Sequence, residues 1–201
     1  MNKRNTLLIQ ILGELAIPLM GFFLWNWSLY FILLFYIIEN LFATYFQVET
    51  FRKFQALIQK KSIPLDVKQL FIFLGFWLLE VIFIHVFLFL TNPSIQFGKE
   101  IIDFFMYEDM GIPQGFLLIP LLYFASTMKM KQDIRTLIIS ITSIDEVNKI
   151  KPTFTYFIAA FIFWIFLAAL ALLISIPETL IISMLLILFL YRTVYRAKLL
   201  V

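Results

Sequence analysis

Long apolar runs separated by short polar segments set the pattern of this chain. Six of these runs come near the roughly 20 residues that a helix needs to cross a bilayer. They predict transmembrane helices at about residues 6–25, 28–47, 68–90, 113–128, 152–174 and 177–195. The fourth run is short and contains Pro120, so its helix is either kinked or only partly spanning. The expected fold is all-α, a polytopic membrane protein in which residues 1–201 form one transmembrane helical domain.

Three of the polar connections also carry apolar residues at helical spacing. They fall within residues 49–68, 91–115 and 128–151, and each predicts an amphipathic helix on the membrane surface. The apolar faces consist of Phe51, Phe54 and Ile58 in the first segment, Phe97, Ile101, Phe104 and Phe105 in the second, and Ile134, Leu137, Ile138, Ile141, Ile144 and Val147 in the third. The first segment is basic and the second is acidic.

Composition and charge agree with this pattern and orient the chain. The sequence is 62% hydrophobic, with a mean hydropathy of +0.95. If both termini are cytoplasmic, only Lys99 of the 16 lysines and arginines lies on the outer side, as the positive-inside rule requires. Lys3 and Arg4 precede an apolar run without a small-residue cleavage site, so we expect an uncleaved first helix. The expected location is the cell membrane, multi-pass, in the cytoplasmic membrane of a prokaryote. No nucleic-acid partner is expected, because the basic residues mark topology.

Polar side chains inside the apolar runs form the candidate binding site. An ionisable group deep in lipid costs roughly 2.5–3.5 kcal/mol on insertion scales, so a partner or a task usually holds it there. At about 1.5 Å per helical residue, three glutamates fall near the midplane and the single histidine lies about 7 Å further outward. The predicted midplane cluster consists of Glu14, Tyr36, Glu39, Asn40, Glu80 and His85.

Two interpretations of this cluster stay open. Each carboxyl group can simply hydrogen-bond to a neighbouring helix while protonated, because burial disfavours the charged form. Alternatively, the groups form one functional site. Glu80 and His85 are five residues apart, about 140° around a helix at ~100° per residue, so a shared site needs a wide interior, a π-bulge or intervening polar groups. That spacing matches no helical metal pair, and the sequence identifies no cofactor, metal ligand or catalytic residue.

Three classes of function follow from the cluster and its surroundings. The first is binding or transport of protons, a cation or a small solute, with an acidic outer loop that attracts cations. The second is a non-catalytic subunit or scaffold of a membrane complex, whose basic inner segments bind anionic lipid headgroups. The third is an intramembrane enzyme acting on a lipid-like substrate, with Glu39 or Glu80 as the base and His85 as the acid or as a ligand. Ala171 and Ser175 have the spacing of a small-residue packing motif, which leaves a homo-oligomer open. The chain contains no cysteine and no nucleotide-binding or hydrolase motif.

The segment Pro18–Gln47 carries two recognisable motifs, a turn with Trp27-Ser28 and a Tyr-x-x-Glu-Asn sequence formed by Tyr36, Glu39 and Asn40. In these motifs it resembles an uncharacterised family of bacterial and archaeal multi-pass membrane proteins, a domain of unknown function. Gly75 and His85 are similar to the glycine and histidine of a later helix of that family. The resemblance implies a multi-pass membrane fold and brings no activity with it.

Overall fold

The computed structural model describes residues 16, 18–25, 27–106, 114–140 and 155–199. Within these ranges the regular structure is helical and no strand occurs. The helices are α2 (Leu29–Gln59), α3 (Val67–Thr91), α4 (Phe97–Met106), α5 (Gln114–Ser140), α7 (Thr155–Ala171) and α8 (Glu178–Leu199), and residues 18–23 form a short helical segment before α2. The all-α prediction is confirmed. Most of the first predicted helix, including Glu14, lies outside the described residues.

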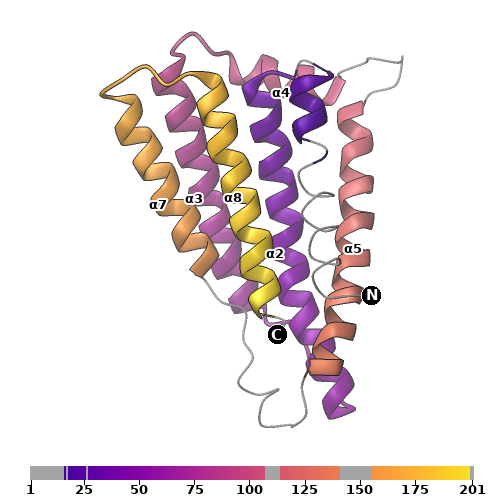
Figure 1. Ribbon diagram of the computed structural model, residues 1–201. Helices are drawn as coiled ribbons and strands as arrows, with labels where there is room; N and C mark the ends of the chain where they lie inside the picture. The colour runs from indigo at the N-terminus through magenta and orange to yellow at the C-terminus, as the bar shows by residue number, and fades with distance from the viewer. Residues whose placement is uncertain (1–15, 17, 26, 107–113, 141–154, 200–201) are drawn as a thin grey trace.

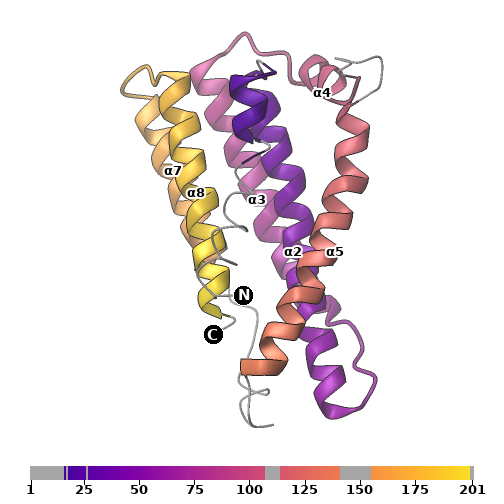
Figure 2. The ribbon, with the colours of Figure 1, turned by 45° about the vertical axis from the view of Figure 1, so that its right-hand side comes forward.

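The long helices run side by side and alternate in direction along the chain (Figure 1). Neighbours pack in the order α8, α7, α3, α2, α5, so that α2 and α3 lie in the middle. Helix α4 lies across one end of this series, where it packs against α2 and α5 (Figure 2). We call this end, at the top of both figures, the α4 end, and the opposite one the far end.

Helix α2 continues past the predicted end of its span at residue 47. It contains no glycine or proline, and it ends at Gln59, where Lys60 takes a left-handed conformation with φ 48°. The prediction of a separate surface helix within residues 49–68 is therefore wrong. Its apolar residues Phe51 and Phe54 belong to the last turns of α2.

The same correction applies to α5, which runs as one helix through Pro120 to Ser140. The short span predicted at 113–128 and the first part of the surface helix predicted at 128–151 are one element, while residues 141–151 lie outside the described ranges. The surface helix predicted within residues 91–115 corresponds to α4.

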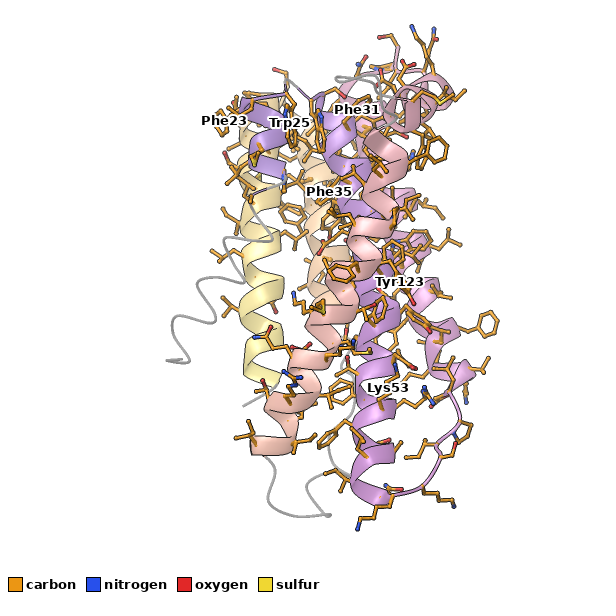
Figure 3. The ribbon with its side chains drawn as sticks, turned by 90° about the vertical axis from the view of Figure 1, so that its right-hand side faces the viewer. Phe23, Trp25, Phe31, Phe35, Lys53 and Tyr123 are labelled. Atoms are coloured by element: carbon orange, nitrogen blue, oxygen red, sulfur yellow. The ribbon has the colours of Figure 1, made fainter. Side chains whose placement is uncertain are left out.

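The two corrections share one physical reason, which is that the apolar faces cover each other. The buried cluster at the far end combines Phe46, Phe51 and Phe54 of α2 with Met130, Ile134 and Leu137 of α5. Tyr123 of α5 lies on the α4 side of this cluster (Figure 3). The centroid of its ring is 5.4 Å from that of Phe46. Within the described residues, the buried part of each apolar face therefore packs against the other helix and not on a membrane surface.

Apolar surface on the outside of the helices agrees with membrane association. Helices α2 and α3 are long and apolar enough to cross a membrane, and shorter apolar stretches occupy Ile158–Ala171 and Thr179–Leu188. Helix α3 leaves large side chains uncovered, among them Phe71 at 68%, Leu78 at 53% and Phe89 at 54% of their full exposure. Soluble monomers rarely expose contiguous apolar surface of this kind.

A tight connection leads from residues 18–23 into α2. The Trp27 backbone N–H donates to the Gly21 carbonyl at 2.8 Å, and Ser28 caps α2 by accepting from the Phe31 N–H at 3.2 Å. A β-carbon on Gly21 would lie 2.3 Å from Cε3 of the Trp27 ring. Only glycine leaves room for this indole, which is buried in the main core.

Candidate functional site

Glu80 lies in the middle of α3 and is buried, with 2% of its surface exposed. Its Oε1 accepts hydrogen bonds from the Tyr36 hydroxyl and from Nε1 of Trp164, the latter at 3.2 Å. Its Oε2 accepts from Nδ2 of Asn40 at 2.5 Å. One carboxylate of α3 is thereby bonded to α2 and to α7.

The positions of these donors follow from helical geometry and from packing. Tyr36 and Asn40 are four residues apart, so they lie one above the other on the face of α2 that meets α3. Trp164 is fully buried on α7. The centroid of its ring is 6.3 Å from that of Tyr36 and 5.9 Å from that of Phe87. Packing of the aromatic rings therefore helps to fix the positions of the Tyr36 and Trp164 donors. A carboxyl group offers at most about four acceptor positions, and these three donors occupy most of them.

His85 belongs to a second group of contacts, closer to the α4 end. Its Nδ1 lies 2.8 Å from the Val81 carbonyl oxygen and its Nε2 lies 3.0 Å from the Tyr30 hydroxyl. A carbonyl oxygen can only accept, so Nδ1 carries the hydrogen, and in the neutral ring Nε2 accepts from Tyr30. The rings of Tyr30, His85 and Phe97 pack together, with centroids 5.0–5.8 Å apart. The hydrogen bonds found for Glu80 and His85 thus go to different partners.

The structure brings together part of the predicted midplane cluster. Tyr36, Asn40 and Glu80 are directly bonded, whereas His85 contacts Tyr30. Glu39 is only partly buried. Glu14 lies outside the described residues. Within the described ranges, no group of three or more histidine, aspartate and glutamate side chains could hold a metal ion.

Sequence reasoning missed Trp164 and Tyr30. Both stand in apolar runs as aromatic residues with one polar hydrogen, and such a hydrogen usually finds an acceptor when the ring is buried. The sequence therefore indicates that each of these residues needs a hydrogen-bond acceptor, but it does not indicate which residue supplies the acceptor. The acceptor of Trp164 is 84 residues away in the sequence and that of Tyr30 is 55 residues away.

A pocket of about 370 Å³ lies at the α4 end, where α2 begins and α3 ends. Its polar and charged lining includes Ser28, Tyr30, Asn92, Lys99 and Glu100, and Ile176 and Ile181 contribute apolar wall from the α8 side. Tyr30 joins this pocket to His85, because it lines the first and is hydrogen-bonded to the second.

An ion-pair group marks the far end of α2. Arg52 donates two hydrogen bonds to Glu49, at 2.6 and 2.7 Å, and a third to the Ile63 carbonyl oxygen at 3.0 Å. Lys53 lies 3.4 Å from the same carboxylate. The predicted span ends at residue 47, and this group follows it, about 30 Å along the helix from Leu29. The hydrogen bonds from Arg52 lower the pKa of Glu49 below its usual value, against the opposing effect of burial.

Comparisons of this chain with protein-family models, with curated proteins and with solved structures find no match.

Proposed function

We propose that this chain is a multi-pass integral membrane protein that acts as a non-catalytic subunit or scaffold, with Glu80 as the polar clamp of its helices. The observation that carries the proposal is the set of donors around Glu80, which come from α2 and α7. In hydrocarbon a polar group has no water to bond, so its hydrogen bonds to neighbouring helices keep those helices in place. Because protein donors occupy most acceptor positions of the carboxylate, little of it is left for a substrate or an ion.

The membrane part of the proposal has six spans, with both termini in the cytoplasm. Basic residues gather at the far end, where α2 ends and α3 begins, and Lys99 stands at the α4 end. The positive-inside rule then places the far end in the cytoplasm. There the basic residues can contact anionic lipid headgroups, at about 1 kcal/mol per residue. Reporter fusions after Lys60, Lys99 and Lys149 are expected to read inside, outside and inside. A reversed or non-alternating result would contradict this topology.

The clamp is tested by Glu80→Gln in detergent micelles and in reconstituted vesicles. Glutamine keeps the size of the side chain but replaces one acceptor oxygen with a donor, which then faces another donor. We expect a lower free energy of unfolding. We also expect no proton or cation flux through the wild-type protein. A variant as stable as wild type, together with a wild-type flux that the substitution abolishes, would remove the clamp interpretation.

A second candidate, binding or transport of protons, is favoured by the Tyr30–His85 pair. Tyr30 lines the pocket at the α4 end, and His85 bonds to the carbonyl of Val81, the residue after Glu80. These hydrogen bonds lead from the pocket as far as the backbone of α3 next to Glu80. On this reading His85→Gln lowers a pH-driven proton flux while leaving the unfolding free energy nearly unchanged. The absence of any flux in the wild-type protein would exclude the candidate.

An intramembrane enzyme receives no comparable support from the geometry. His85 would have to act as an acid, yet both of its ring nitrogens already bond to protein groups. Glu80 would have to act as a base, yet its two oxygens accept from three donors.

A further inference from the structure

The pocket at the α4 end offers one positive and one negative side chain to a ligand. Lys99 and Glu100 both line it. They are consecutive residues of α4, so their side chains leave the helix about 100° apart. The ion pairs found in the described part of the chain involve Glu49 with Arg52 and Lys53, and do not include these two residues. Both charges can therefore act on a bound molecule.

The uncharged polar groups of the pocket add hydrogen-bond donors. Ser28 uses its oxygen to accept from the Phe31 N–H, which leaves its own hydrogen to donate. Asn92 accepts a hydrogen bond from the Ser94 hydroxyl through Oδ1 at 2.7 Å, which leaves the hydrogens of its side-chain amide to donate to a ligand. Together with the Lys99 ammonium, these donors suit the oxygens of a phosphate, and the Glu100 carboxylate suits an ammonium group.

The remaining wall is apolar and lies beside exposed apolar surface. Leu88, Ile176 and Ile181 line the pocket, and the nearby turn between α7 and α8 exposes Leu172 at 70% and Leu173 at 80%. The volume of about 370 Å³ is near the lower end of the roughly 300–1,000 Å³ found for ligand pockets, so it fits a small polar group. At the end of membrane-length helices, this is the depth of lipid headgroups.

We propose that this pocket binds the zwitterionic head group of a phospholipid whose amine is a primary ammonium. Lys99, Ser28 and Asn92 hold the phosphate, Glu100 holds the ammonium, and the apolar wall receives the start of the acyl chains. The inference rests on the proposed membrane location and is independent of the clamp at Glu80.

The test is native mass spectrometry of the detergent-purified protein with phosphatidylethanolamine, phosphatidylcholine or phosphatidylglycerol added at equal concentration. Phosphatidylethanolamine is expected to bind most tightly, because the methylated amine of phosphatidylcholine cannot donate to Glu100 and phosphatidylglycerol has no amine. Glu100→Gln should weaken phosphatidylethanolamine by about tenfold, as for loss of one charge-assisted hydrogen bond, and remove its preference over phosphatidylglycerol. Lys99→Gln should weaken all three lipids.

Matched controls are Asp103→Asn, an exposed carboxylate on the same helix, and Lys68→Gln, an exposed lysine at the far end. Neither should change lipid binding. Melting temperatures of all four variants should equal that of the wild type. If Glu100→Gln does not fold, Asn92→Ala provides the second variant, and it should weaken all three lipids in the same way as Lys99→Gln.

Equal binding of the three lipids, or variants that bind as the wild type does, would overturn the proposal. A further measurement with glycerophosphoethanolamine, the water-soluble head group without acyl chains, distinguishes a lipid ligand from a free head-group compound. If the soluble compound binds as tightly as the lipid, the assignment to a lipid fails. Failure of the membrane proposal would look different, because the protein would then be released from membranes by an alkaline carbonate wash.

Discussion

Replacing Trp164 with phenylalanine tests how much stability the Glu80 clamp contributes. The change removes the indole N–H that donates to Oε1 of Glu80 at 3.2 Å. A typical hydrogen bond contributes about 0.5–1.5 kcal/mol in soluble proteins, and 3.2 Å is at the long end of the usual range. Interhelical hydrogen bonds in membrane proteins average about 0.6 and reach about 1.7 kcal/mol. We therefore expect this bond to contribute about 1 kcal/mol.

The smaller ring also leaves a cavity, since Trp164 is fully buried, and a double-mutant cycle separates the two effects. Glu80→Met keeps the length of the side chain and removes both acceptor oxygens. In that background the indole N–H has no carboxylate to bond, so Trp164→Phe should destabilise the protein by about 1 kcal/mol less than in the wild type. The measurement is reversible unfolding in mixed detergent micelles, followed by fluorescence or circular dichroism.

Trp77→Phe is the matched control for this cycle. Its indole N–H donates to the Ile37 carbonyl oxygen at 3.0 Å, and not to the Glu80 carboxylate. Its coupling to Glu80→Met should therefore stay below about 0.5 kcal/mol. A coupling near zero for Trp164, or one no larger than that of Trp77, would refute the view that Glu80 stabilises the bundle through α7.

Three further predictions concern the packing and the charged end. Gly21→Ala should lower the free energy of unfolding by about 1–3 kcal/mol, because its β-carbon meets the Trp27 ring at 2.3 Å. A β-carbon on Gly75 would have no atom within 4 Å, so Gly75→Ala should leave the free energy of unfolding unchanged or raise it by up to about 1 kcal/mol. Equal effects of the two substitutions would contradict the close packing of Trp27 on Gly21. Leu137→Ala, in the buried contact between α2 and α5, should cost about 2–5 kcal/mol, whereas Ile139→Ala, 83% exposed, should stay within about 0.5 kcal/mol. If denaturant titrations give both the same midpoint, that contact does not hold the two helices. Arg52 lowers the pKa of Glu49 in the folded protein. The stabilisation of the fold by ionised Glu49 is therefore complete above about pH 5, the range above the unfolded pKa, and is lost as the pH falls through the folded pKa. Melting curves of wild type and Glu49→Gln should differ at pH 7 and converge in acid, and a constant difference would argue against the ion pair.

The presence and approximate location of α2, α3, α4, α7 and α8 could be read from the residues alone, whereas the extent of α2 and of α5 could not. Apolar runs of membrane length predicted helices where α2, α3, α7 and α8 occur, because length and periodicity are local properties of the chain. The same is true of α4, whose phenylalanines recur at helical spacing. Expecting Glu80 at about the depth of Glu39, the neighbour of Asn40, needed only the rise of a helix.

Which surfaces meet depended on the tertiary structure. The stripe with Phe51 and Phe54 has the same pattern whether it lies on a membrane or on another helix, and only the packing of α5 against α2 distinguishes the two. In the same way, the position of Glu80 midway along α3 is a local property, but its partner Trp164 comes from a helix that sequence spacing does not connect to it. The physical reason is that periodicity records which side of a helix is apolar. Contacts between helices depend on the path of the connecting chain and on the shapes of side chains far apart in sequence.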